Sequence, residues 1–160
     1  MELEIIKNSI HEIRGKKVML DMDLAKLYEV ETRVLKQAVR RNMERFPEDF
    51  MFELTKDEWN IIRSQLVMFK NGQGKFPKYL PFVFTEQGVA MLSAVLNSEY
   101  AVRISVKIMR AFVALRQWTL NHQEISERLN TMEKQFGQKF TEIDQVLNYL
   151  IKKDQHQTQQ

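Results

Sequence analysis

The sequence predicts an α+β fold: a small mixed domain with a helix-turn-helix and β-hairpins, followed by a long C-terminal amphipathic helix of the coiled-coil type. Three observations support it. Short β-type runs alternate with helical apolar spacing, a helix-turn-helix skeleton lies between Asp21 and Asn42, and no proline follows Ser98. We expect three segments: a domain over 1–118, a coiled-coil helix over 119–152 and a disordered tail over 153–160.

The first elements are expected to be a hairpin and two helices. Residues 5–13 alternate in the manner of a strand, and the turn at 14–17 leads into the apolar residues 18–20. The next helix has Asp21 or Asp23 as its N-cap, because short acidic side chains bond to free N–H groups at helix starts. Thr32 is predicted to cap a second helix, which ends before Pro47.

The second half of the domain repeats strand and helix signals. Residues 50–54 form a β-type run, and Thr55 opens a capping box that leads into a helix over 58–66. Residues 66–84 are predicted to be a hairpin with the glycine-rich tip NGQG. Residues 85–88 start another helix, which Asn97 and Ser98 end before the long final helix.

The segment DLAKLYEVETRVLKQAVRR has the skeleton of a helix-turn-helix. Such a unit needs a small residue where its helices cross, a tight turn, and apolar residues on the inner side of the second helix. Ala25 is the small residue, and Val30 is the apolar anchor after the turn. Glu29 stands at the turn position that glycine fills most often. The inner residues are predicted to be Val34 or Leu35, Ala38 and Val39.

The outer face of the second helix is basic. Its residues recur at spacings of three, four and seven, so they project to one side. Arginine can donate two hydrogen bonds to guanine, and glutamine can pair with adenine in the same way. Thr32, at the helix N-terminus, can also reach a phosphate. The alternative is a merely solvated charged face. The predicted DNA-binding residues here are Thr32, Arg33, Lys36, Gln37, Arg40 and Arg41.

The NGQG hairpin can be interpreted as a wing beside the second helix. Lys70, Lys75 and Lys78 flank its tip and are predicted to bind phosphates. Gly72 and Gly74 would allow a close approach of the backbone. The alternative is an ordinary surface loop.

The C-terminal segment carries a heptad stripe, with one four-residue insertion near Gly137. An amphipathic helix of this kind buries its stripe against a second copy or against its own domain. Its length and spacing favour a dimer. Trp118 and His122 begin the stripe, and the predicted dimerisation residues are Ile125, Leu129, Met132, Phe136, Phe140, Ile143, Leu147 and Leu150.

Charge and composition limit the classes of function. Residues 1–118 carry 19 Lys/Arg against 15 Asp/Glu, a net of +4, so positive charge belongs to the predicted domain. The chain has no cysteine, its histidines lack ligand spacing, and no apolar run could span a bilayer. A metal nuclease is disfavoured because Lys56 stands three residues beyond Glu53, not two. We expect no enzymatic activity, catalytic residue, cofactor, metal or membrane contact, and a cytoplasmic, nucleoid-associated location.

Three blocks of sequence carry a resemblance to a known family. They are DLAKLYEVETRVLKQAVRRNMERFPEDFMFELT, YLPFVFTEQGVAMLSAVLNS and IMRAFVALR. Together they resemble the ORF-six-N domain family, relatives of the phage KilA-N DNA-binding domain, from about Ile10 to Trp118. The resemblance implies a small α+β DNA-binding domain of phages, prophages and mobile elements, joined to variable C-terminal segments. Ser105 departs from the asparagine expected there.

The expected function is that of a sequence-preferring protein that binds double-stranded DNA, a transcriptional regulator of a prophage or mobile element. Its expected partners are double-stranded DNA and a second copy of the chain. The alternative is an antirepressor-like module that captures another regulator protein through its C-terminal helix.

Overall fold

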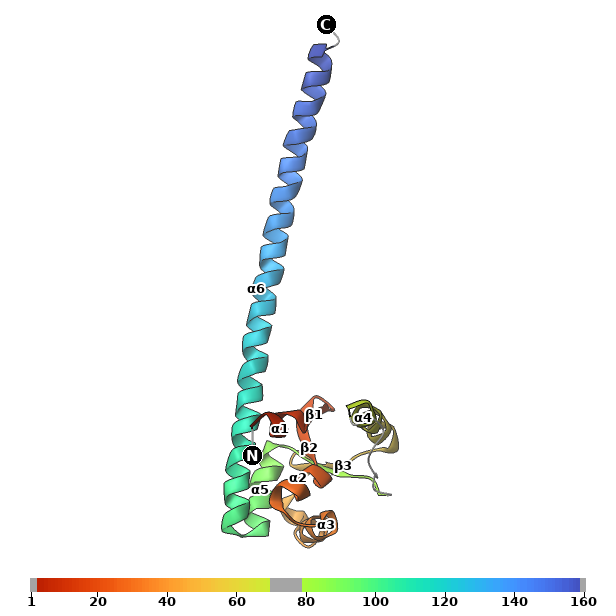
Figure 1. Ribbon diagram of the computed structural model, residues 1–160, viewed down its shortest axis with the longest axis vertical. Coiled ribbons are helices and arrows are strands. Elements are labelled where there is room, and N and C mark those ends of the chain that lie inside the picture. The colour runs from red at the N-terminus through yellow and green to blue at the C-terminus, as the bar shows by residue number, and fades with distance from the viewer. Residues whose placement is uncertain (1–2, 70–78, 159–160) are drawn as a thin grey trace. The chain divides into compact units, whose positions relative to one another are not determined.

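The computed structural model describes residues 3–69 and 79–158, which form two compact units that divide after Leu115. Figure 1 shows a mixed domain and a long helix, as predicted. The elements are α1 (Leu3–Asn8), β1 (Ile10–Ile13), β2 (Lys16–Leu20), α2 (Asp21–Tyr28), α3 (Thr32–Arg40), the 3-10 turn η1 (Met43–Arg45), β3 (Met51–Glu53), α4 (Lys56–Phe69), β4 (Phe82–Phe84), α5 (Glu86–Leu96) and α6 (Glu99–Thr158).

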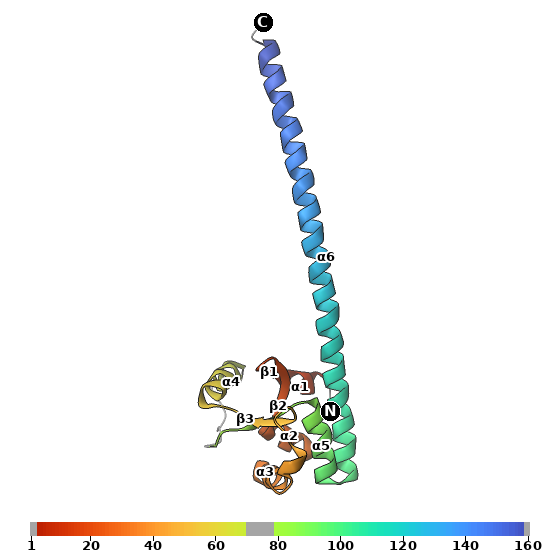
Figure 2. The same cartoon turned by 180° about the vertical axis from the view of Figure 1, so that it is seen from behind.

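The strands form one antiparallel sheet in the order β1-β2-β4-β3. Its side chains pack into two separate hydrophobic cores, one on each face of the sheet. Helices α2, α3, α5 and α6 share the first core, to which α1 adds Ile6, while α4 covers the second (Figures 1 and 2). Because both faces are covered, β2 and β4 need apolar residues at successive positions rather than at alternate ones.

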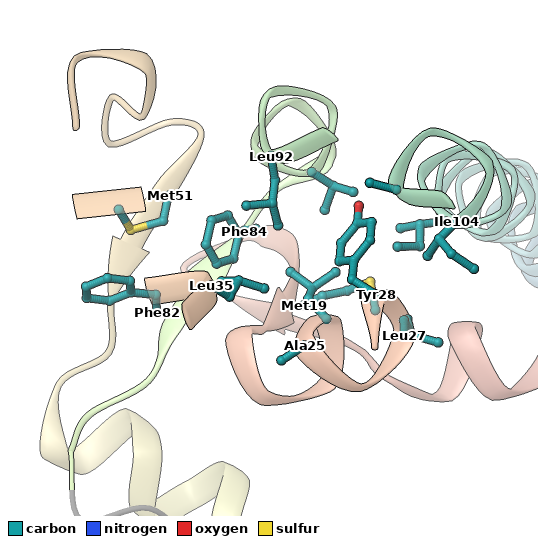
Figure 3. Close-up of a cluster of buried hydrophobic side chains, with 14 of the residues drawn as sticks. Met19, Ala25, Leu27, Tyr28, Leu35, Met51, Phe82, Phe84, Leu92 and Ile104 are labelled. Carbon is teal, nitrogen blue, oxygen red and sulfur yellow. The ribbon is translucent and has the colours of Figure 1, made fainter. Parts of the chain in front are cut away.

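Strand β4 shows this division most clearly. Phe82 and Phe84 enter the first core, and Val83 between them enters the second. Strand β2 does the same, with Met19 on the first side and Leu20 on the second. Figure 3 shows side chains of the first core converging from strands β2, β3 and β4 and from helices α2, α3, α5 and α6.

The hairpin β1–β2 is confirmed, with Ile13 paired to Lys16 across a two-residue turn. Arg14 and Gly15 both have left-handed backbone angles, φ of 54° and 72°, as in turns that match the twist of a hairpin. The predicted strand over residues 5–13 is wrong in its first half, since residues 3–8 are helix α1. That helix buries only Ile6, so the short segment has too few core contacts for its period to be clear in the sequence.

The predicted hairpin over residues 66–84 is also wrong in its first strand. Helix α4 continues to Phe69, and β4 pairs with β2 and β3. Trp59 and Ile62 are buried and Leu66 is half-buried, and their spacing of three and four keeps one helical face on the second core. The predicted tip, with Lys70, Lys75 and Lys78, lies outside the described residues.

The predicted helix α5 is confirmed, and its start is fixed to the chain before β3. The Thr85 hydroxyl accepts a hydrogen bond from the N–H of Gly88 at 3.4 Å and donates to the carbonyl of Asp49 at 2.8 Å. A Cβ at Gly88 would lie 2.0 Å from the carbonyl oxygen of Phe50, so only glycine fits. Asn97, with φ of 44°, ends the helix.

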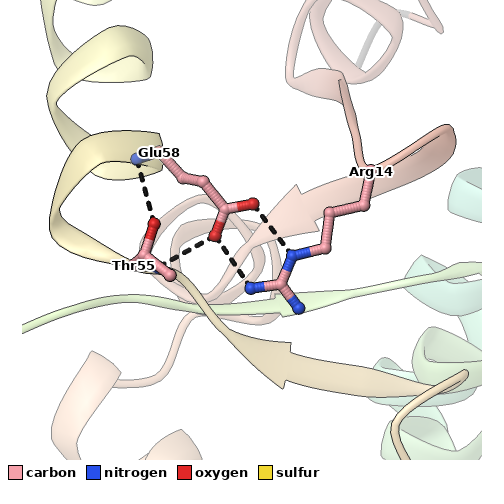
Figure 4. A network of polar contacts seen from close by, with 3 residues as sticks. All are labelled: Arg14, Thr55 and Glu58. Carbon is pink, nitrogen blue, oxygen red and sulfur yellow. Dashed lines mark hydrogen bonds and ion pairs between the residues drawn. The ribbon is translucent and has the colours of Figure 1, made fainter.

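The predicted capping box at Thr55 is present, and a third residue joins it (Figure 4). The Thr55 N–H donates to Glu58 Oε1 at 2.9 Å, and the Glu58 N–H donates to Thr55 Oγ1 at 3.2 Å. Arg14 donates two hydrogen bonds to the Glu58 carboxylate, at 2.8 and 2.9 Å. The turn of the β1–β2 hairpin is thereby tied to the start of α4.

Helix α6 contributes to both units. Between Ala101 and Phe112 its inner side is buried in the first core, whereas every residue from Arg116 to Thr158 is exposed. Residues 153–158, where the sequence predicts a disordered tail, form the last turns of this helix. They include no glycine or proline, so nothing in them stops a helix that has already formed.

Replacing Gly88 with alanine should lower the free energy of unfolding by about 3 kcal/mol, because the new methyl group meets a backbone carbonyl that cannot move alone. The matched control is Gly137→Ala, where nothing lies within 4 Å of the added Cβ. Since Gly137 lies inside α6, that change should stabilise the helix by roughly 1 kcal/mol. Urea unfolding monitored by circular dichroism measures both, and equal effects would contradict the packing at Gly88.

Acid should remove the contribution of the Glu58 network to the free energy of unfolding. The bonds from Arg14 and then from the Thr55 N–H lower the pKa of Glu58 from 4.5 to about 2. The contribution is therefore fully present above about pH 4.5 and is lost as the pH falls through about 2. Carboxyl titration by NMR should give the low pKa, and Arg14→Ala should move it towards the ordinary value. An unchanged pKa in that variant would show that Arg14 is not the cause.

Candidate nucleic-acid interface

A tight left-handed turn joins α2 to α3. Glu29 has φ of 57° and ψ of 42°, so the position that glycine usually fills is kept in the same conformation by a glutamate. The Glu29 N–H donates to the carbonyl of Lys26, and the Val30 N–H donates to the carbonyl of Ala25. This pair of bonds is the Schellman motif, in which the apolar residue after the turn packs back on the helix.

The two helices pack through the residues that the pattern predicts. Ala25 is 2% exposed, and Leu35 and Val39 are fully buried. Of the two alternatives for the first inner position, Leu35 is correct, because Val34 is 42% exposed. Helix α3 therefore turns a narrow apolar edge towards α2 and α5 and leaves most of its circumference outside.

The outer surface of α3 is basic. Arg33, Gln37, Arg40 and Arg41 are exposed. The nearest acid to Arg33 is Glu31 at 3.6 Å, and since their side chains are 83% and 73% exposed the pair is weak. Arg40 also lies over the ring of Phe82, with its guanidinium carbon 5.6 Å from the ring centre. Arg33, Gln37 and Arg41 can therefore exchange water for another partner with little effect on the fold.

Thr32 does not cap α3, contrary to the sequence prediction. It is the first residue of the helix, and the preceding Glu31 is the N-cap, with no side-chain hydrogen bond to the helix. Thr32 is half-buried at the free N–H end of α3, where helices attract anions.

Lys36 differs from the other predicted contact residues because its side chain is only 11% exposed. Its ammonium group lies 3.6 Å from Asp21 Oδ2, donates to the carbonyl of Leu80 at 3.1 Å and lies 4.5 Å from the ring centre of Phe82. Lys36 thus ties α3 to α2 and to the chain entering β4. The outer face of α3 is one basic residue smaller than predicted.

Asp21 is not the predicted N-cap of α2 either; it is the buried partner of Lys36. Leu20 is the N-cap, and Asp21 Oδ2 accepts the Phe82 N–H at 2.9 Å. Burial raises the pKa of Asp21, and the Phe82 N–H and Lys36 oppose the increase. The carboxylate therefore holds the N-terminus of β4 against the start of α2.

A cavity of about 450 Å³ lies beside α3, where the chain comes back into β4. Arg33 and Arg40 line it from α3, and Tyr79 and Pro81 line it from the other side. Tyr79 is 78% exposed and did not enter the predicted set. It follows a lysine and stands two residues before Pro81, which is typical of a surface residue, but the sequence pattern places it in a predicted strand.

The predicted dimerisation residues lie on α6 in the second unit, apart in sequence from the basic face. All are exposed, with fractions between 49% and 64%. The rings of Trp118 and His122 stack, with centres 4.9 Å apart. Over residues 3–69 and 79–158, no group of three or more His, Asp or Glu residues could hold a metal ion. No helix in those ranges is both long and apolar enough to cross a membrane.

The sequence from residue 8 to residue 95 matches the ORF6N domain, which covers α2, α3, the whole sheet and most of α5. The chain belongs to the ORF6N domain family. This family is associated with phages. No curated protein and no solved structure matches the chain.

The unexpected serine in α6 lies outside the matched stretch of the ORF6N domain. Ser105 Oγ is 2.6 Å from the hydroxyl of Tyr28, and both residues are buried. Burial raises the pKa of Tyr28 to about 12, although the bond to Ser105 opposes the shift. Helix α2 is therefore also attached to α6 through a polar contact.

Replacing Lys36 with alanine should lower the free energy of unfolding by about 3 kcal/mol, because it leaves the Asp21 carboxylate buried without its cation. The matched control is Gln37→Ala, one residue away and exposed, which should change stability by less than about 0.5 kcal/mol. Urea unfolding of both variants measures the difference. Equal stability of the two would show that Lys36 belongs to the solvated face instead.

Proposed function

We propose that this ORF6N protein binds double-stranded DNA with a sequence preference and regulates transcription in a prophage or mobile element. Helix α3 enters the major groove, and the tail of α6 holds two copies together on paired half-sites. The observation that carries the proposal is that α3 has a buried apolar side and an exposed, mainly basic side. Its inner residues Leu35 and Val39 are fully buried, while Arg33, Gln37, Arg40 and Arg41 are exposed on the helix that follows a left-handed turn.

The order of side chains along α3 supports different roles for its two halves. Recognition helices contact base edges mainly with their N-terminal residues. Arg33 stands in the first turn of α3 and Gln37 one turn later, and both side-chain types can form two hydrogen bonds to one base. Arg40 and Arg41 stand at the C-terminal end and are suited to phosphates, which fix position without selecting sequence.

The cavity between α3 and Tyr79 supports a second strip of contact beside the groove. Tyr79 can donate a hydrogen bond to a phosphate, and the neighbouring Arg33 and Arg40 give this side of α3 a positive potential. Lys36 is not part of the proposed contact set, because its ammonium group is occupied by Asp21 and Leu80.

Arg33→Ala and Gln37→Ala should each weaken binding to a preferred duplex by about 1–3 kcal/mol and reduce discrimination against a scrambled one. The preferred duplex is obtained by selection from a random library, and affinities are measured by gel shift at several salt concentrations. The matched control is Arg63→Ala. Arg63 is exposed on α4, which covers the other face of the sheet, and the change removes the same charge.

Two outcomes would contradict the proposal. Equal weakening by Arg63→Ala and Arg33→Ala would mean that overall charge, not the face of α3, governs binding. The absence of any duplex affinity at low salt would leave the antirepressor-like alternative, in which the exposed stripe of α6 captures another regulator.

A further inference from the structure

The tail of α6, defined as residues 116–158, exposes an apolar stripe that no described residue covers. A stripe of this length on a water-soluble helix is covered in most proteins, because about half of each large apolar side chain otherwise stays in water. In heptad notation the core positions d and a alternate along it, except at the four-residue insertion, where two a residues follow each other. The d residues are Trp118, Ile125, Met132, Ile143 and Leu150, and the a residues are His122, Leu129, Phe136, Phe140 and Leu147.

The charged residues that flank this stripe have opposite signs on its two sides. The charged g positions are all basic: Arg128, Lys139 and Lys153. The charged e positions are both acidic: Glu133 and Asp144. In parallel coiled coils each g residue lies beside the e residue five positions later in the other helix, whereas antiparallel helices bring g to g and e to e.

From this segregation we propose that the tails of two copies pack parallel and in register. Arg128 then meets Glu133 of the second copy, and Lys139 meets Asp144. The apolar g residue Val146 meets the apolar e residue Ile151, and both are more than half exposed in the single chain. An antiparallel arrangement, in any alignment, can bring together only like charges from these g and e positions.

The polar residue of the stripe supports the same alignment. Two residues of the stripe, His122 and Trp118, have rings that can form hydrogen bonds, and these two rings are stacked on each other. In register, His122 faces His122 of the second copy, and one ring can donate to the other. In an antiparallel alignment it would face the apolar C-terminal part of the stripe, where its nitrogen atoms lack a partner.

Within its own helix Arg128 pairs with Glu124 at 3.4 Å, and their side chains are 78% and 64% exposed. Such a surface pair contributes little, so it does not prevent Arg128 from meeting a second chain. Leu at a with Ile at d favours more than two strands. Parallel packing of four helices brings the same g and e residues together. The charge pattern therefore determines the orientation and register of the helices, and not their number.

Disulfide trapping in the full chain tests the orientation, since the natural sequence has no cysteine. Ile125→Cys and Leu150→Cys are d positions near the two ends of the stripe, and each should form covalent dimers with itself under mild oxidation. The matched control is Asn130→Cys, on the outer side of the helix, which should cross-link far more slowly. Self-linking of neither core variant, with linking only when Ile125→Cys is mixed with Leu147→Cys, would overturn the proposal.

Charge reversal gives a second, non-covalent test. Arg128→Glu should weaken self-association roughly threefold or more at low salt, because it opposes Glu133 of the second copy. The double variant Arg128→Glu with Glu133→Arg should restore it. In an antiparallel pair that brings Arg128 to Lys139, the single reversal would instead place unlike charges at facing g positions and strengthen association. Sedimentation equilibrium measures the association constants.

This inference rests on the self-association in the proposed function, and the measurements keep the two apart. A monomer in sedimentation overturns both the orientation and the pairing. A tetramer with self-linked cysteines supports the orientation and contradicts the pairing of two copies. Antiparallel cross-links with intact duplex binding in the gel shift overturn this inference alone.

Discussion

The three residues of β4 are the constraint on which the domain depends. Phe82 and Phe84 fill one core, Val83 fills the other, and the strand pairs on both edges. The Phe82 N–H is bound by the Asp21 carboxylate, and Leu80, just before the strand, accepts from Lys36. A strand this short has few backbone bonds of its own, so its position depends on side chains of α2 and α3. The pair of helices α2 and α3 and the sheet therefore stabilise each other.

This arrangement has a bearing on the basic face of α3. A helix used for sequence discrimination has to keep its side chains within a few tenths of an ångström of the productive geometry. Leu35 and Val39 hold α3 by dispersion and burial, and Lys36 holds it by a directed, buried contact. The residues that face outward are thereby supported by a rigid inner edge rather than by a loop.

The features that could be predicted from the sequence are those that depend on neighbouring residues. The hairpin turn at Arg14 and Gly15, the capping box at Thr55 and the start of α5 at Thr85 each rest on residues within four positions of one another. The roles of Asp21 and Lys36 were not predictable in this way, because their partners lie 61 and 44 residues away. An aspartate at this position can either cap the helix or accept a hydrogen bond from a distant N–H. Only the tertiary fold distinguishes the two roles.

Helix α6 is continuous from Glu99 to Thr158, and this has a consequence for how the tail becomes ordered. Closing the first turn is the unfavourable step in helix formation, whereas each later residue adds a hydrogen bond for one more fixed residue. Core packing between Ala101 and Phe112 already fixes the first turns. The ORF6N domain thus nucleates the helix that follows it. In the pairing proposed above, tails extended from such a nucleus would lose less chain entropy than a free peptide of the same sequence.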